Sequence, residues 1–209
     1  MSSSFIFSTA YFPPLSYFSS LLKAKEVLIE HHEHYFKQTY RNRAEIYGAN
    51  EMLLLAIPVD HQNLFSIPIK EVRISYRERW QKIHWRSIES AYRNSPYFEY
   101  YEDELSVFYE KEYEFLCDWN HDLLMHVLKI LGMDKKISFT ESYQEQHEDV
   151  SDLRNEFIPG KKLTTAKFSE VQYKQVFSDR HGFIPDLSIL DLIFNEGHKA
   201  LDWLEKMSV

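Results

Sequence analysis

The first 30 residues constrain the fold more than any other part of the sequence. Residues 5–12 are rich in β-branched and aromatic side chains and stop at Pro13-Pro14, which is typical of a strand that enters a turn. Residues 15–25 repeat apolar side chains at helical spacing, and residues 27–30 form a second short apolar run. A strand, helix and strand within roughly 30 residues have the size of a βαβ crossover. The sequence therefore predicts an α/β fold with parallel strands.

The rest of the chain adds a second group of strands and then mostly helices. A hairpin is predicted at 44–47 and 52–59 around Gly48-Ala49-Asn50, with a further strand at 65–74. Helices are predicted over 77–93, 98–109 and 112–131, and Gly132 is placed to end the last of them. The C-terminal third predicts a strand at 137–140, a polar loop at 143–149, a helical turn at 152–157, an ambiguous stretch at 171–177, a helix over 189–194 capped by Ser188, and a last helix after Gly197. We expect residues 1–209 to form one domain, in which a mixed sheet from the N-terminal strands packs with a helical central and C-terminal part.

Charge and composition exclude several classes of protein. The net charge of −8 argues against a nucleic-acid partner, because binding phosphates usually needs a basic face. Cys117 is the single cysteine, so no intramolecular disulfide or cysteine-based zinc site is possible, which fits a cytoplasmic protein. No apolar run reaches the roughly 18 residues of a membrane span, and the N-terminus has no signal-peptide pattern. The aromatic fraction of 16% favours pocket walls and interfaces, including a homo-oligomer contact, or else a core built from large side chains.

The common catalytic and nucleotide-binding motifs are absent from the sequence. It has no Walker A pattern, no G-x-G-x-x-G, no H-E-x-x-H and no G-x-S-x-G. His32 and His34 would share one face of a strand and could reach one metal ion. A solvated cluster at the end of a strand explains them better, so we predict no metal site. The sequence does not indicate which cofactor, if any, the protein uses.

The Tyr-Arg-Asn-Arg segment of residues 40–43 is the main candidate for binding a ligand. Lys37, Arg41 and Arg43 place three cations within seven positions of an acidic chain. Guanidinium groups suit bidentate capture of carboxylate or phosphate, and the amide of Asn42 can orient a polar ligand beside Tyr40. The alternative is a solvated turn whose arginines pair with acidic side chains.

His84 is the candidate catalytic residue. It shares an apolar helical stripe with Trp80 and Ile88, so it is either a general base or acid or a hydrogen-bonded core histidine. Asp152 and Arg154 form a further candidate pair, for which local pairing is the simpler explanation.

Three blocks of the sequence resemble the WbqC-like protein family. Residues 10–14, 40–46 and 57–59 are similar to its N-terminal half, residues 80–98 to its central helix, and residues 182–192 to its C-terminal signature. The resemblance implies a bacterial cytoplasmic protein of surface-glycan biosynthesis, since WbqC is named from O-antigen gene clusters. It also brings Tyr11 into the ligand-binding set. Many members carry Gln two positions before the Tyr-Phe-Pro stretch, where this chain has Thr9, so a ligand contact by that Gln is in doubt here.

The resemblance and the residues together give three functional hypotheses. The first is a transferase that moves an acyl or aminoacyl group, such as glycine, to a nucleotide-linked amino sugar. Arg41 and Arg43 would hold the anionic part of the substrate, a phosphate or carboxylate. Asn42 and Tyr40 would orient the acceptor, and His84 would take the proton from the attacking amine. The second is a non-catalytic binding or assembly protein of the same pathway. The third is a nucleotidyltransferase-like enzyme, although residues 14–17 lack both histidines of the His-x-Gly-His motif of that class.

Overall fold

The N-terminal unit is a parallel crossover, as predicted. The computed structural model describes residues 4–60, 66–147 and 149–208. In it, β1 (Ser4–Ser8) leads through α1 (Leu15–Lys23) to β2 (Glu26–Glu30), and the two strands pair in parallel over their whole length. Pro14 is extended and precedes the first turn of α1, so it starts the helix. The strand predicted at 5–12 is shorter than expected, because β1 ends at Ser8 and residues 9–12 separate it from the proline pair.

Two further strands complete a parallel sheet of order β5-β2-β1-β6. The predicted strand at 137–140 is confirmed as β5 (Lys136–Phe139), which pairs with β2. β6 (Val150–Asp152) pairs with β1, whereas the sequence predicts a polar loop at 143–149 and a helical turn at 152–157. The helical turn is wrong, because Asp152 ends the strand and residues 153–157 form a non-helical turn. A three-residue edge strand of sequence Val-Ser-Asp is too short to show an alternating pattern, which explains why it was missed.

The predicted hairpin is present as a separate antiparallel pair. β3 (Arg43–Tyr47) and β4 (Met52–Ala56) turn back through the expected Gly48 region. The expected strand at 65–74 is wrong in the residues that the structure describes, from 66 onward, because a 3-10 helix, η1 (Ile69–Glu71), follows Pro68. The Ile69 amide donates to the Glu33 carbonyl, which anchors this turn in the core rather than in a sheet.

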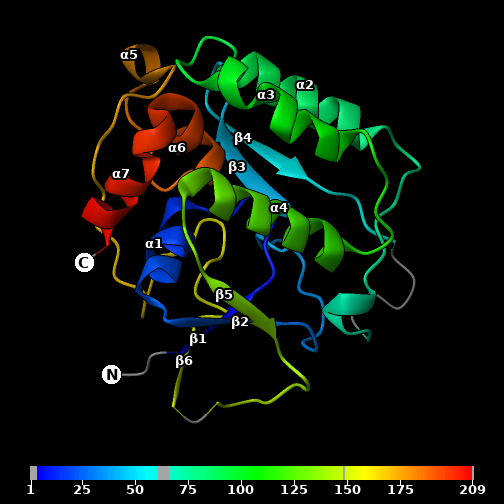
Figure 1. The fold of residues 1–209 in the computed structure, drawn as a ribbon. Coiled ribbons are helices and arrows are strands. Elements are labelled where there is room, and N and C mark those ends of the chain that lie inside the picture. The colour runs from blue at the N-terminus through cyan, green and yellow to red at the C-terminus, as the bar shows by residue number, and fades with distance from the viewer. Residues whose placement is uncertain (1–3, 61–65, 148, 209) are drawn as a thin grey trace.

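The helices follow the predicted pattern. The described helical elements are α2 (Trp80–Tyr92), α3 (Phe98–Ser106), η2 (Val107–Tyr109), α4 (Leu116–Leu131), α5 (Ser178–His181), α6 (Ile189–Glu196), η3 (Gly197–Lys199) and α7 (Ala200–Met207). The Ser188 hydroxyl accepts from the Leu190 amide, which confirms the predicted cap, while residues 171–177 form neither helix nor strand. Figure 1 shows the β3-β4 hairpin near α2 and α3, and the parallel sheet at the other end of the molecule beyond α4. No helix within the described residues is both long enough and apolar enough to span a bilayer.

The aromatic side chains mainly build the core. Trp119, Tyr11, Tyr47 and Tyr92 are among the largest side chains that are fully buried. Some of their polar atoms form hydrogen bonds inside the core. The Tyr92 hydroxyl, for example, accepts a hydrogen bond from the Tyr47 amide at 3.1 Å. The structure thus favours the interpretation that most of the aromatic surplus is core material.

Two glycines with positive φ provide a test of the packing around the C-terminal helices. At Gly197 (φ +56°) a Cβ would lie 2.4 Å from the Tyr97 ring, whereas at Gly132 (φ +67°) it would meet nothing within 4 Å. We expect Gly132→Ala to lower the free energy of unfolding by about 1–2 kcal/mol through backbone strain alone. Gly197→Ala should cost about 2 kcal/mol more through overpacking. Equal losses in urea titrations of the two variants would contradict this packing.

Candidate functional site

The strand order of the parallel sheet makes the carboxyl ends of its strands the expected place for a ligand site. From β1 the chain moves to β2 and β5 on one side, and it then returns to β6 on the other side of β1. In open α/β sheets, ligands bind outside the carboxyl ends of the strands at such a reversal. The residues that follow β1, β2 and β6 are therefore the first candidates for a site.

A buried ion pair lies at this edge and involves the candidate Arg41. The Arg41 Nε donates to Glu33 Oε1 at 2.8 Å, and Nη2 donates to Glu33 Oε2 at 2.6 Å. Both side chains are at most 4% exposed. Burial raises the pKa of Glu33, and the hydrogen bonds from Arg41 oppose this shift. Because Glu33 occupies one edge of the guanidinium fork, this geometry does not favour Arg41 as the capturing group for a ligand anion.

A second buried pair lies beside the first. Arg154 Nη1 donates to Glu30 at 3.1 Å, and Arg154 Nε donates to Asp152 at 3.0 Å. The remaining Arg154 hydrogens reach the carbonyl oxygens of Gln144 and Glu145 and the second oxygen of the Asp152 carboxylate. The local pairing of Asp152 and Arg154 is present, and it extends into the core through Glu30.

The segment of residues 40–43 meets β1 and α4 through its backbone. The Tyr11 amide donates to the Tyr40 carbonyl at 2.8 Å. Asn120 Nδ2 donates to the Arg41 carbonyl at 2.8 Å and lies 3.2 Å from Thr9 Oγ1. Residues far apart in sequence therefore converge around the end of β1.

His84 lies within this convergence and is almost sealed from solvent. It is 5% exposed, and its Nδ1 lies 3.1 Å from the Tyr11 hydroxyl, which lies 2.7 Å from the Tyr109 hydroxyl. Burial lowers the pKa of His84 to about 4, and a hydrogen bond with the Ala56 backbone partly opposes this shift. The ring is therefore neutral at pH 7. If one nitrogen donates to the Ala56 carbonyl, Nδ1 accepts from Tyr11, and Tyr11 accepts from Tyr109. Ala56 pairs with Arg43 across the hairpin, which brings Arg43 to the same region.

Several buried polar atoms around His84 and the 40–43 segment have no partner among the residues that the structure describes. They are Asn42 Oδ1, Arg43 Nε, Asn120 Oδ1 and the indole nitrogens of Trp80 and Trp119. The Trp80 ring lies 5.1 Å from His84 and 5.3 Å from Trp119, centroid to centroid. Native proteins leave few buried polar groups unpaired, and such groups mark strain, a catalytic role or a place for water or ligand. We call these five side chains with Thr9, Tyr11 and His84 the polar centre.

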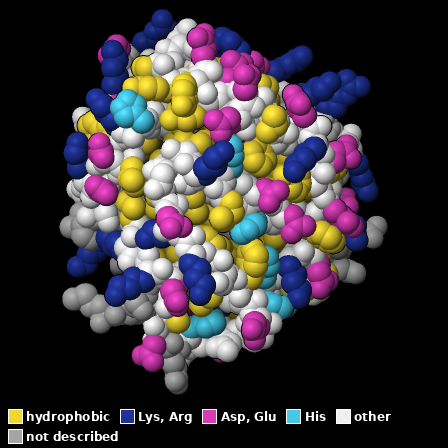
Figure 2. Space-filling view, in the orientation of Figure 1, with side chains coloured by type: hydrophobic (Ala, Val, Ile, Leu, Met, Phe, Trp, Pro, Cys, Tyr) yellow, Lys and Arg dark blue, Asp and Glu magenta, His cyan; other side chains and the backbone are white. Residues whose placement is uncertain are grey.

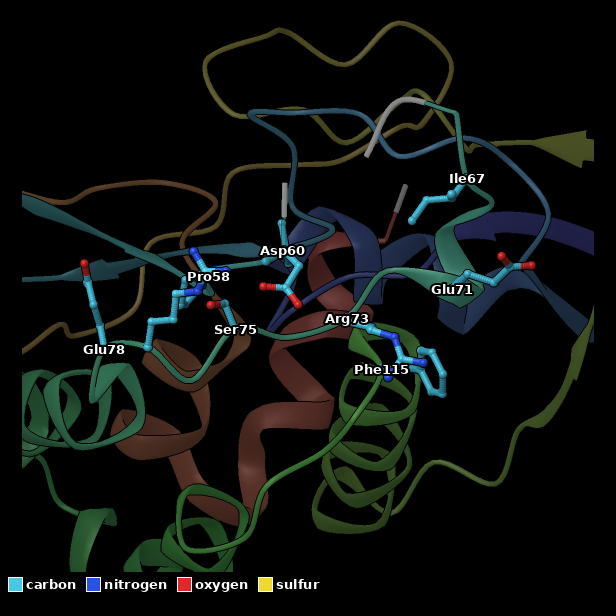
Figure 3. A pocket seen from close by; sticks show the side chains of 10 residues that line it. Pro58, Asp60, Ile67, Glu71, Arg73, Ser75, Glu78 and Phe115 are labelled. Atoms are coloured by element: carbon cyan, nitrogen blue, oxygen red, sulfur yellow. The ribbon is translucent and has the colours of Figure 1, made fainter. Parts of the chain in front are cut away.

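Two hollows open beside α2, and one of them includes Tyr109. The Tyr109 cleft, of about 630 Å³, is lined by Tyr76, Glu78, Arg79, Gln81, Lys82, Trp85, Ser106, Tyr109, Glu110 and Glu112. The Arg73 hollow, of about 840 Å³, shares Glu78 with it. In Figure 3 the Arg73 guanidinium lies against the Phe115 ring, and Asp60 lies between Pro58 and Arg73. Tyr109 thus links a surface cleft to the polar centre through its hydroxyl contact with Tyr11.

The structure brings together only part of the predicted set. Tyr11 and His84 are in direct contact, and Arg41 contributes its carbonyl to the same region. Asn42 and Arg43 are connected to it through the hairpin backbone, at Ile57 and Ala56. The Tyr40 hydroxyl instead donates to Glu45 at 2.6 Å, and the Lys37 side chain is exposed. Sequence reasoning missed Asn120 and Tyr109. Asn120 had a signal, since it is a polar residue within the apolar stripe of 112–131. Tyr109 has no sequence signal that distinguishes it from the other aromatic residues.

The histidines near β5 pack mainly against an aromatic ring. His31 and His121 lie 3.9 Å and 4.8 Å from the Phe139 ring, centroid to centroid. Figure 2 shows several histidine side chains on the lower half of this face. Among the described residues, no group of three or more His, Cys, Asp or Glu side chains could hold a metal ion.

Comparison with known proteins identifies the family. The family model of the WbqC-like protein family matches residues 9–158 and 154–203. The chain belongs to this family. The uncharacterized protein Rv1507c of Mycobacterium tuberculosis is 27% identical to this WbqC-like protein over 225 residues, which cover 95% of this chain and 96% of that protein. No solved structure matches the chain.

Removing the Arg41 charge from this WbqC-like protein should be strongly destabilising. Arg41→Met keeps the length of the side chain but leaves the Glu33 carboxylate buried without its counterion, which we expect to cost about 3–5 kcal/mol. The exposed pair Arg73–Glu114 gives the matched control, and Arg73→Met should cost less than about 1 kcal/mol. Similar midpoints for the two variants in urea unfolding would show that the buried pair has no special role.

The low pKa of His84 predicts how the stability of the fold depends on pH. Between pH 6.5 and 4 the unfolded chain binds a proton at His84 that the folded chain excludes, so this group destabilises the fold as the pH falls through that window. The stability of wild type relative to His84→Gln should fall by up to roughly 3 kcal/mol between pH 7 and pH 4. Tyr11→Phe should keep most of this dependence, because burial is the larger cause. A pH-independent difference between wild type and His84→Gln in urea titrations would contradict the assignment.

Proposed function

We propose that this WbqC-like protein is a transferase of bacterial surface-polysaccharide biosynthesis. In this proposal it moves an acyl or aminoacyl group, such as glycine, onto the amine of a nucleotide-linked amino sugar. The family name, which is associated with O-antigen biosynthesis, supports the pathway. The arrangement of the polar centre and the Tyr109 cleft supports the chemistry.

The observation that carries the proposal is the hydroxyl chain from Tyr109 through Tyr11 to His84. When an amine attacks an acyl carbon, a carbon–nitrogen bond forms and the bond from that carbon to the leaving group breaks. The amine also loses a proton, which needs an acceptor. The proton would pass to Tyr109 while Tyr109 donates its own to Tyr11 and Tyr11 to His84 Nδ1. Protonated His84 would then return the proton along the same chain to the departing group.

The Tyr109 cleft offers suitable contacts for a nucleotide-linked sugar. The Tyr109 cleft contains Arg79 and Lys82 beside the rings of Tyr76 and Trp85. Cations suit the phosphates, and aromatic faces suit a base or sugar ring. The volume of about 630 Å³ lies within the range usual for small-molecule sites.

Residues 41–43 take different roles in this proposal. Arg43 Nε and Asn42 Oδ1 are buried and have no hydrogen-bond partner in the described part of the chain, so they would bind polar groups of a ligand that reaches the polar centre. Arg41 is held by Glu33 and would act by positioning, since its carbonyl fixes Asn120.

One observation favours the second hypothesis, a binding or assembly protein. Met52, Leu53 and Leu54 of β4 are 44%, 39% and 41% exposed, and β4 has no strand neighbour except β3 among the described residues. An apolar edge strand is a common place for another chain to pair. A homo-oligomer through β4 is compatible with a transferase, and a sedimentation measurement of Leu54→Lys against wild type would detect it.

Ligand-dependent melting tests the proposed transferase. We expect nucleotide sugars, acyl-CoA compounds or amino acids to raise the Tm of wild type, because a ligand that binds only the folded state stabilises it. Arg43→Ala should lose most of that shift. With a donor and acceptor found in this way, Tyr109→Phe should lower kcat by about 100-fold while the Tm shift by the acceptor persists.

The exposed Tyr100 gives the matched control for the kcat measurement on Tyr109→Phe. Tyr100→Phe should retain wild-type kcat, since its side chain is 74% exposed and outside the cleft lining. A ligand that stabilises wild type and Arg43→Ala equally would remove Arg43 from the site. Full transfer activity in Tyr109→Phe would refute the hydroxyl chain as the proton path.

A further inference from the structure

A separate crevice lies at the carboxyl ends of β2 and β6. It has a volume of about 240 Å³ and is lined by His32, Glu33, His34, Phe36, Tyr143, Arg154 and Asn155. None of these residues lines the Tyr109 cleft or the Arg73 hollow. It occupies the edge of the sheet at which open α/β folds bind ligands.

Two aromatic rings in this crevice are both held in place and accessible. Phe36 and Tyr143 are 53% and 54% exposed, which is unusual in a chain whose aromatic residues are mostly buried. The guanidinium carbon of Arg41 lies 5.4 Å from the centroid of Phe36, and that of Arg154 lies 5.3 Å from the centroid of Tyr143. Each ring therefore rests on a buried arginine, which limits its motion and leaves the remainder of its surface to the crevice and solvent.

The charges beneath the rings are already paired, which limits the kind of ligand that fits. Arg154 uses its Nε and both Nη atoms on Asp152, Glu30 and two backbone carbonyl groups. Glu33 accepts two hydrogen bonds from Arg41. A phosphate or carboxylate would have to displace one of these buried partners, whereas an uncharged ring would leave them intact. Asn155 and His34 are exposed at the crevice and can bond to the polar edge of such a ring.

We propose that this crevice binds a nucleobase, stacked on Phe36 and Tyr143. The base is a planar heterocycle with donors and acceptors on its edge, and its size suits a crevice smaller than the usual site for a complete ligand. The base can belong to a free nucleoside or to a nucleotide-linked sugar. The proposal does not depend on the transferase function, because it concerns binding at residues outside the Tyr109 cleft.

Calorimetric titration of the full chain tests the proposal. Adenosine, guanosine, cytidine and uridine are titrated in turn, then uridine diphosphate glucose and guanosine diphosphate mannose, with ribose and glucose as ligands that lack a base. We expect at least one base-containing ligand to bind and both sugars to fail. The double variant Phe36→Ala/Tyr143→Ala should weaken that binding by about tenfold or more, since each stacked aromatic ring contributes appreciably to holding a base.

Two matched variants separate loss of stacking from other effects. Phe36→Tyr/Tyr143→Phe keeps both rings and should bind as wild type, and Tyr100→Ala removes an exposed ring elsewhere and should also bind as wild type. Binding of a nucleoside that the double alanine variant loses assigns the crevice to the base alone. Binding of only a nucleotide sugar, again lost in the double alanine variant, assigns the crevice to the base within a larger ligand. Absence of binding by all six base-containing ligands overturns the proposal. So does equal binding by wild type and the double alanine variant, a result that leaves the transferase proposal standing.

Discussion

The buried pairs Arg41–Glu33 and Arg154–Glu30 hold together the parts of the chain on which the site depends. They are joined, because Arg41 Nη2 also donates to the Arg154 carbonyl at 3.3 Å. The connection ties the end of β2, the segment before β3 and the end of β6 into one unit. Desolvating these charges is costly, as the raised pKa of Glu33 indicates, so the pairs act more by fixing one arrangement than by adding stability. With Arg41 fixed, its carbonyl can hold Asn120, and the neighbouring Tyr40 carbonyl can hold Tyr11.

The parts of the fold that the sequence predicts are those with a local physical signal. The prolines after β1, the apolar periodicity of α2 and α4, and the glycine that follows α4 each act within a few residues. Gly132 adopts the left-handed conformation expected after a helix, with its amide donating to Lys129. β6 had no such signal, because its strand partner, β1, lies about 145 residues earlier in the chain. The stretch at 65–74 carries an apolar pattern that falsely predicts a strand. Ile69 is apolar because it packs in the core from a 3-10 helix and not because it lies in a sheet.

The site was harder to predict than the fold, and Arg41 shows why. The sequence places it beside Asn42 and Arg43 as if the three residues shared one role. In the structure the side chain of Arg41 reaches Glu33, while Asn42 donates to the Ile57 carbonyl at 2.8 Å. Nothing in the sequence tells which of 32 acidic residues accepts a given arginine. His84 can be singled out as a candidate from the sequence because its apolar stripe is a periodic pattern, but its link to Tyr109 joins helical elements whose packing has no local signature.

The burial of His84 decides what kind of chemistry it can support. A ring with a pKa of about 4 is deprotonated at pH 7, so it is always ready to accept a proton, but it is a weak base. Such a base suits a donor that becomes acidic during the reaction, as an amine does once it has attacked an acyl carbon. The Tyr11 and Tyr109 hydroxyl groups have pKa values raised by burial, so they hold their protons and can only pass one on as they receive another. A ligand phosphate near the Tyr109 cleft would add negative charge and would raise the pKa of His84 toward neutrality. In the proposed transferase, the buried ring would then become a better base only when an anionic substrate is bound, and this would couple proton transfer to occupancy of the cleft.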